Sequence, residues 1–154
     1  MIKRIHHVGV VVKNLDEALD LYVNNLGFKA SKIMIADKGE KFRTVMVSLG
    51  EVTLELIEPM DGKGGIQNFL ETRGEGIHHI SLEVDDIRAE LNTLGAKGIK
   101  FLFKEPEQVE GTLVTFVHPK STRGVLMELL QPDGSPSNGS GGRNDKQTKR
   151  GNKD

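Results

Sequence analysis

The chain has 154 residues and a net charge of −1, with 36% hydrophobic and 28% charged residues, which fits one globular domain or two half-domains that share a core. This charge gives no reason to expect nucleic acid or an anionic membrane as a partner, and no apolar run reaches the roughly 18 residues of a membrane-spanning helix. The absence of cysteine excludes disulfides, thiolate metal sites and cysteine nucleophiles, and it favours a cytoplasmic location, as does an N-terminus without a signal-peptide apolar region.

The first half of the chain predicts a strand, a helix and three further strands. Residues 5–12 alternate as a strand does. Asn14 can cap a following helix, and Gly27 stands where a helix is expected to end. The helix carries an apolar stripe at helical spacing, made of Leu15, Leu19, Tyr22, Val23 and Leu26. Three strand-like runs then follow, at residues 28–36, 42–49 and 52–58.

The second half repeats this order after a short predicted helix and linker at residues 65–74. Residues 77–84 form the next strand, and Asp85 or Asp86 caps a helix that precedes Gly98. That helix has its own apolar residues, Ile87, Leu91 and Leu94, and the strands expected after it are residues 99–103, 113–118 and 125–130. Residues 132–154 contain no Ile, Val, Leu, Phe or Met, so we expect a disordered polar tail.

Each half is therefore a βαβββ module, and the two halves match in sequence. The tripeptide Ile-His-His occurs twice, at residues 5–7 and 77–79, and VTLELIEP at 52–59 matches VLMELLQP at 125–132. Such repetition predicts a pseudo-symmetric α+β domain over residues 1–131, with modules at about 3–60 and 75–131. The two modules are expected to form a cupped mixed sheet.

Four polar residues of the repeated strands are expected on the inner face of this sheet. Side chains of a strand alternate between its two faces, so His7 and His79 lie opposite the aliphatic residues that pack under the helices. The same alternation turns Glu55 and Glu128 inward. By contrast, His6 and His78 fall on the helix side, at strand ends where they reach solvent.

Two imidazoles and two carboxylates are a suitable ligand set for one divalent metal ion. A single strand histidine is more often a structural residue, and a single strand glutamate more often faces solvent. The recurrence of both types at matched places favours a metal site, although a duplication would copy structural residues as well.

The chain resembles the vicinal oxygen chelate superfamily, and within it the methylmalonyl-CoA epimerases, over about residues 3–131. The resemblance rests on IHHVGVVVKNLDEAL, LELIEP, FLETRGEGIHHISLEVDDI and FVHPKSTRGVLMELLQ. It implies paired modules around one divalent ion (Co, Mn, Zn, Ni or Fe), an acyl-CoA thioester as substrate and a homodimer. The metal ligands that it implies are His7, Glu55, His79 and Glu128.

The resemblance also implies a reaction, the interconversion of the (2R) and (2S) forms of methylmalonyl-CoA through a metal-stabilised enolate. Glu128 would serve as both ligand and base on one face of the α-carbon. Some family members have a glutamate base on the third strand, but Thr44 stands at or near that position here, and Glu40 is the nearest carboxylate. The alternatives are a glyoxalase I-type lyase acting on a thiol hemiacetal, a dioxygenase, and a non-catalytic binding protein of the same fold.

The loop after the seventh expected strand offers groups for the substrate. Lys120 and Ser121 are candidates to hold a substrate carboxylate or a CoA phosphate. The alternative is that Pro119 and its polar neighbours only form a turn between two strands.

Overall fold

The computed structural model describes residues 1–134, so the predicted disorder of the tail beyond Gly134 lies outside the described residues. The described chain contains nine strands, three α-helices, one π-helix and one 3-10 turn. In chain order they are β1 Ile2–Val11, α1 Leu15–Leu19, the π-helix Asp20–Asn25, β2 Lys29–Ala30, β3 Met34–Lys38, β4 Glu40–Leu49, β5 Val52–Pro59, α2 Gly65–Arg73, β6 Gly76–Val84, α3 Ile87–Ala96, β7 Glu107–Val109, β8 Thr112–Val117, the 3-10 turn Pro119–Ser121 and β9 Met127–Pro132. None of the helices within residues 1–134 is long and apolar enough to cross a membrane.

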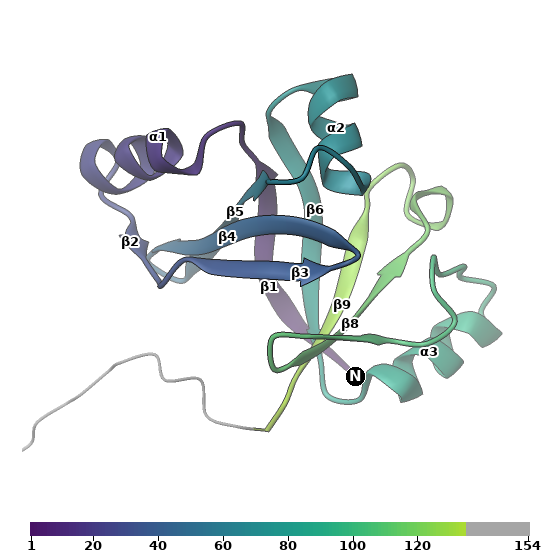
Figure 1. Cartoon of the computed structure of the whole chain (residues 1–154). Helices are drawn as coiled ribbons and strands as arrows, with labels where there is room; N and C mark the ends of the chain where they lie inside the picture. Colours follow the sequence, from purple (N-terminus) through teal and green to yellow (C-terminus); the bar gives the residue numbers. More distant parts are fainter. Residues whose placement is uncertain (135–154) are drawn as a thin grey trace, which may run out of the picture.

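All nine strands belong to one mixed sheet, whose order is β2-β4-β5-β1-β6-β9-β8-β7, with β3 paired to β4. The two equivalent strands β1 and β6 pair antiparallel in its middle, and each pairs in parallel with the last strand of its own module, β5 or β9. The sheet curls, and α1 and α3 lie toward its opposite ends (Figure 1). The predicted cupped α+β fold is confirmed.

The core follows the repeat, with one apolar cluster for each module. Val12, Leu15 and Leu56 belong to the first cluster, and their equivalents Val84, Ile87 and Leu129 belong to the second. A third cluster joins Val11 and Ile57 to Ile66 of α2. Both faces of β1 are therefore covered, as alternation predicts: Val10 packs against the first cluster, and Val11 packs in the third cluster with Ile66 of α2.

The two main helices begin in the same way. Asn14 Oδ1 accepts from Glu17 N at 3.1 Å, and Asp86 Oδ1 accepts from Ala89 N at 3.0 Å, so both predicted caps are confirmed. A second side chain, from the last strand of each module, accepts from the first N–H of the helix: Glu58 Oε2 from Leu15 N at 2.5 Å, and Gln131 Oε1 from Ile87 N at 2.8 Å. Each helix is thereby tied to the strand beneath it.

The first predicted helix changes its winding after one turn. Its second part is the π-helix, in which Leu26 N donates to Leu21 O, five residues back, instead of four. The apolar stripe read at α-helical spacing therefore fails at its end, where Leu26 is 54% exposed. Gly27 does end the helix, with a φ of 81°.

The strand predicted at residues 99–103 is wrong. This segment pairs with β8 only through the bridge between Phe101 and Val117, flanked by one backbone hydrogen bond on each side. Pairing does not extend further along the segment, so residues 99–103 form an isolated bridge and no strand. The short strand β7 takes the outer position instead, joined to β8 by a turn at Glu110 and Gly111.

Candidate active site

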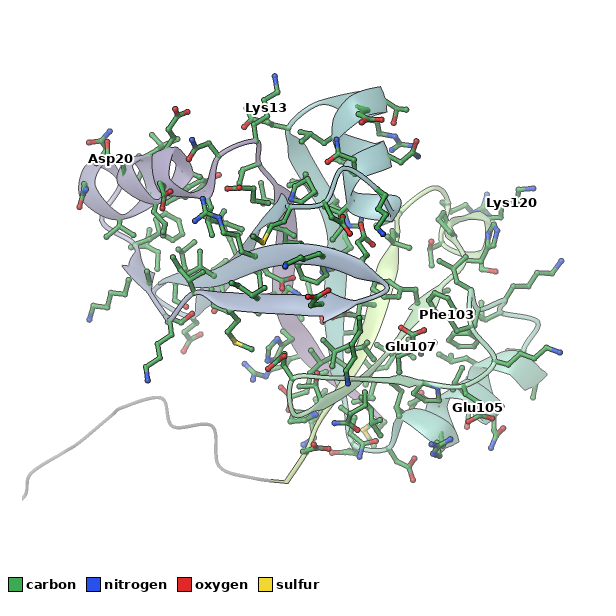
Figure 2. All side chains as sticks on the ribbon, in the orientation of Figure 1. Lys13, Asp20, Phe103, Glu105, Glu107 and Lys120 are labelled. Carbon is green, nitrogen blue, oxygen red and sulfur yellow. The ribbon has the colours of Figure 1, made fainter. Side chains whose placement is uncertain are left out.

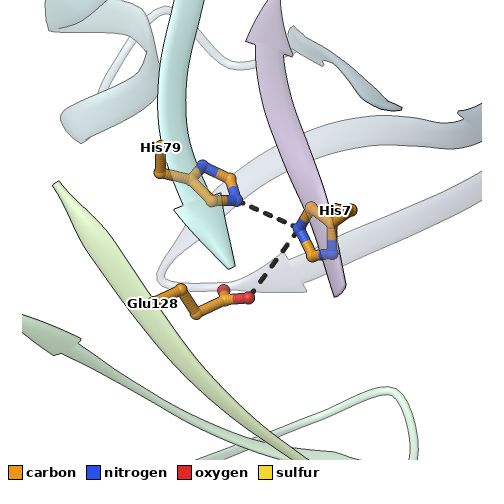
Figure 3. Close-up of side chains that lie close together, drawn as sticks. All are labelled: His7, His79 and Glu128. Carbon is orange, nitrogen blue, oxygen red and sulfur yellow. Dashed lines mark hydrogen bonds and ion pairs between the residues drawn. The ribbon is translucent and has the colours of Figure 1, made fainter. Parts of the chain in front are cut away.

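Four neighbouring strands bring the predicted site residues together. His7 lies on β1, Glu55 on β5, His79 on β6 and Glu128 on β9, and these strands are adjacent in the order β5-β1-β6-β9. The register explains the meeting, because Gly9 lies opposite both Glu55 and His79. Figure 3 shows His7, His79 and Glu128 pointing toward one another from three strands.

The ligand atoms of these residues converge around His7 Nε2. That nitrogen lies 3.1 Å from His79 Nε2, 3.2 Å from Glu55 Oε2 and 3.8 Å from Glu128 Oε1. Donor atoms that bind one divalent ion at about 2.1 Å, about 90–110° apart, lie roughly 3.0–3.4 Å from each other. The spacing around His7 is close to this range, and His7, His79 and Glu128 can place one ligand atom each within 4.8 Å of the other two.

The chemistry of these donors also fits a cation. His7 is 3% exposed, His79 4% and Glu128 8%, so water solvates them poorly. Two Nε2 lone pairs 3.1 Å apart repel each other unless a proton or a cation lies between them, and a buried carboxylate is costly without a positive partner. The residues present therefore fit a divalent metal ion.

The two carboxylates have opposite electrostatic environments. Burial raises the pKa of Glu55, but hydrogen bonds from His7 and His79 outweigh burial and hold that pKa well below its usual range. Burial also raises the pKa of Glu128, and here the nearby His79, His7 and Ser81 do not offset it, so the pKa stays above its usual value. The pKa of His79 is lowered by burial but raised more by Glu55 and Glu128, so it lies above its usual value.

Two hydroxyl groups, which sequence reasoning did not assign as partners, orient the carboxylates. Thr44 Oγ1 donates to Glu55 Oε1 at 3.0 Å, and Ser81 Oγ donates to Glu128 Oε1 at 2.7 Å. Both follow from strand pairing, since β4 runs beside β5 and β6 beside β9. The sequence did contain a sign of the role of Ser81, because alternation along the strand puts Ser81 on the inner face, between His79 and Glu83.

Gly9 is the counterpart of Ser81 in the first module, and the His79 ring occupies the space beside it. A Cβ atom at Gly9 would lie 2.2 Å from His79 Cε1. The two modules thus differ at this position: one makes room for an imidazole, and the other supplies a hydroxyl group to a carboxylate.

His6 and His78, the outer histidines, do not lie where the alternation of the strands predicts. His6 Nδ1 is 2.8 Å from His7 Nδ1, and His78 Nδ1 is 3.0 Å from His79 Nδ1. Both outer rings are half-buried instead of facing solvent. Burial, aided by the neighbouring inner histidine, lowers the pKa of His6 and lowers that of His78 to about 4.

The remaining predicted site residues lie outside this cluster. Glu40 Oε1 accepts from Ile66 N at 2.6 Å at the start of α2, so the structure gives it a helix-capping contact. Ser121 Oγ accepts from Lys100 N at 3.0 Å. Lys120 is exposed and points away from the body of the protein (Figure 2). Their proposed roles in catalysis and substrate binding stay predictions.

Comparisons with known proteins agree with this fold. Residues 6–116 match the Glyoxalase/Bleomycin resistance protein/Dioxygenase superfamily. The chain is 39% identical over 130 residues to the mitochondrial methylmalonyl-CoA epimerase of Dictyostelium discoideum, a match that covers 83% of this chain and 78% of the relative. It is 35% identical over 135 residues to the ethylmalonyl-CoA/methylmalonyl-CoA epimerase of Cereibacter sphaeroides, covering 85% of this chain and 99% of that relative.

A solved structure is similar over nearly the same length. A variant of Streptomyces coelicolor methylmalonyl-CoA epimerase, in complex with 2-nitronate-propionyl-CoA, matches with a TM-score of 0.80 and 28% identity, covering 89% of this chain and 99% of that chain. The resemblance expected from the sequence is confirmed. The chain belongs to the Glyoxalase/Bleomycin resistance protein/Dioxygenase superfamily and, within it, to the methylmalonyl-CoA epimerase family.

Proposed function

We propose that this chain epimerises methylmalonyl-CoA by moving the α-proton between the two faces of the substrate. Its membership in an epimerase family supports this activity. The observation that carries the proposal is the convergence of two imidazoles and two carboxylates from four adjacent strands, with His7 Nε2 at its centre.

His7, Glu55, His79 and Glu128 are the residues that would hold a divalent metal ion. When bound, a Co, Mn, Zn, Ni or Fe ion would supply a Lewis acid that stabilises the negative charge arising when the α-proton leaves. Glu55 suits the role of a ligand, because the hydrogen bonds from His7 and His79 hold its pKa well below the usual range and make it a weak base.

Glu128 is the proposed acid/base on one face of the α-carbon. A base works best when its pKa lies near the working pH, and burial moves the pKa of Glu128 in that direction. Ser81 fixes Oε1 by its hydrogen bond, which leaves the other carboxylate oxygen to take or return the proton.

Inversion also requires a group on the opposite face. Glu40 is our candidate from the sequence, and it would have to release Ile66 N to reach the substrate. Thr44 already lies beside Glu55, but a hydroxyl group is a poor base near neutral pH. A Glu40→Gln variant that keeps full activity would remove Glu40 from the mechanism.

The CoA portion of the substrate is anionic, and the exposed ammonium group of Lys120 suits a phosphate as a point charge. Replacing Lys120 with Ala is expected to raise KM by about two- to fivefold with little change in kcat, the size of one exposed charge contact. A homodimer and a cytoplasmic location also belong to this proposal; sedimentation of the purified protein and imaging of a tagged chain test them.

The decisive experiment is deuterium incorporation. Metal-loaded protein is incubated with (2R)- or (2S)-methylmalonyl-CoA in D₂O, and the label at the α-position is followed with the ratio of stereoisomers. A chelated sample and the variants His79→Ala and Glu128→Gln are expected to lose exchange. Glu51→Gln, at an exposed turn, is a matched control that should keep it.

Exchange with inversion that is lost in the chelated sample and in both site variants would support the proposal in full. Exchange that survives chelation would show that the activity does not require the metal. No exchange in the metal-loaded protein would overturn the epimerase proposal, and thiol hemiacetals would then be tested as substrates of a glyoxalase-type lyase.

A further inference from the structure

Four imidazole rings form one continuous chain across the centre of the sheet. His6 Nδ1 is 2.8 Å from His7 Nδ1, His7 Nε2 is 3.1 Å from His79 Nε2, and His79 Nδ1 is 3.0 Å from His78 Nδ1. Successive rings stand nearly perpendicular, with interplanar angles of 78°, 82° and 89°. Each inner ring therefore has one nitrogen at the candidate metal site and the other nitrogen on an outer histidine.

Two bulges in the pairing of β1 with β6 create this arrangement. Between the pairs Ile5–Leu82 and His7–Ser81, strand β1 carries one extra residue, which is His6. The symmetric irregularity on β6 leaves His78 as the extra residue, between residues 77 and 79. A bulge re-aims the side chain of its extra residue. Without it, His6 and His78 would point to the opposite face from their neighbours.

The proton on each inner ring decides whether that ring can bind a cation. A neutral imidazole carries one proton, and the nitrogen that binds a metal must be free of it. For His7 and His79 to offer Nε2, their protons must lie on Nδ1, and an acceptor must face Nδ1. His6 and His78 supply such an acceptor through Nδ1 when their own protons lie on Nε2.

We propose that His6 and His78 are positioning residues that fix the Nδ1–H tautomer and the ring orientation of His7 and His79, so that both Nε2 atoms face the cation site. The inference rests on the metal site proposed above. The same contact occurs in both modules, because each places a histidine as the extra residue of a bulge. Partners of this kind around metal-bound histidines are generally worth 10–100-fold in metal affinity.

A matched pair of variants at each position distinguishes the effect of the Nδ1 acceptor from the effect of side-chain packing. The Oδ1 atom of asparagine can occupy the place of histidine Nδ1, whereas leucine has the same shape as asparagine and no acceptor. The variants are therefore His6→Asn, His6→Leu, His78→Asn and His78→Leu. Replacing the remaining histidine, His118→Leu, is the control, because its Nδ1 contacts Lys120 N outside the chain of rings.

Two readouts are measured. The first is the affinity for Co²⁺ or Zn²⁺ alone, by competition with a chelator. The second is the ¹⁵N NMR spectrum of the histidine rings in the Zn²⁺-loaded wild-type protein, which needs no variant to fold. We expect protonated Nδ1 atoms on His7 and His79, about 10–100-fold weaker metal binding in both leucine variants, and affinity within a few-fold of wild type in the asparagine variants and the control.

The outcomes separate this inference from the proposed function. Unchanged affinity in folded leucine variants, or Nδ1 atoms of His7 and His79 that lack a proton, would overturn the positioning role while leaving the metal site and the epimerase intact. Equal losses in the asparagine and leucine variants would also overturn it, since packing alone would then be responsible. A wild-type protein that binds neither ion would overturn the metal site and the positioning role together.

Discussion

Replacing Glu58 tests how each module fixes its first helix. Glu58 Oε2 accepts from Leu15 N at 2.5 Å and from Arg43 Nε and Nη2 at 3.1 and 2.9 Å. In the second module, Gln131 accepts the equivalent bond alone among residues 1–134, from Ile87 N at 2.8 Å. One position thus holds a helix through a charged acceptor paired with arginine, and its counterpart does so through a neutral amide.

The magnitudes follow from these partners. Glu58→Ala removes a hydrogen bond to a charged acceptor, worth about 1.5–3 kcal/mol, and leaves Arg43 with Asp16 as its remaining ion-pair partner. Because Asp16 is largely exposed, that pair contributes little, and we expect a total loss of about 2–4 kcal/mol. Gln131→Ala removes one neutral bond and should cost about 1–2 kcal/mol. Glu58→Gln copies the second module and should fall between wild type and Glu58→Ala.

The assay is urea unfolding at pH 7, followed by circular dichroism and compared at constant m-value. The order of the free energies of unfolding is the critical result: wild type, then Glu58→Gln, then Glu58→Ala, with Gln131→Ala less damaging than Glu58→Ala. If Gln131→Ala were as damaging as Glu58→Ala, the charge and the arginine would contribute nothing, and the reasoning would be refuted.

Three further predictions concern buried polar groups. Thr115 Oγ1 is buried without a hydrogen-bond partner among the described residues, so Thr115→Val should raise the free energy of unfolding by about 0.5–2 kcal/mol. The control, Thr112→Val, loses a hydrogen bond to the Val109 carbonyl and should lower the free energy of unfolding, and thermal unfolding of both variants measures the difference. Ser81→Ala removes a bond that lowers the pKa of Glu128, so the ascending limb of the kcat–pH profile should move to higher pH, and an unmoved limb would contradict this role. Folding lowers the pKa of His78 from 6.5 to about 4, so between these two pH values the unfolded chain binds more protons than the folded protein. The free energy of unfolding should therefore decline by at most about 3 kcal/mol as the pH falls from 6.5 to 4, and urea unfolding of His78→Asn should show a smaller decline.

The clustering of the four candidate residues could be predicted from the sequence because it depends on the most reliable feature of a strand, its period of two. His7 and His79 lie opposite aliphatic residues, and Glu55 and Glu128 lie between residues that pack under the helices. Duplication then supplied the second piece of information, since matched positions in paired modules fall on equivalent strands. The structure places all four side chains in one cluster, as that reasoning required.

What could not be predicted depends on register and on local irregularity. The bulges at His6 and His78 need the pairing of β1 with β6, which is not encoded in either strand alone. The hydroxyl partners are equally non-local, because Thr44 and Glu55 belong to different strands. The π-helical winding that exposes Leu26 could not be predicted from an apolar stripe that assumes the spacing of an α-helix throughout.

The position and the asymmetry of the site have separate origins. Because β1 and β6 pair antiparallel, His7 meets its own copy, His79, and duplication alone builds a symmetric pair of imidazoles. The carboxylates are equivalent in sequence but not in environment: the pKa of Glu55 is held low by both imidazoles, and that of Glu128 is raised by burial. Two carboxylates with separated pKa values can divide the work between a permanent anion and a proton carrier. The symmetric part of the fold therefore suits holding a cation, and the departures from symmetry favour Glu128 over Glu55 as the proposed base.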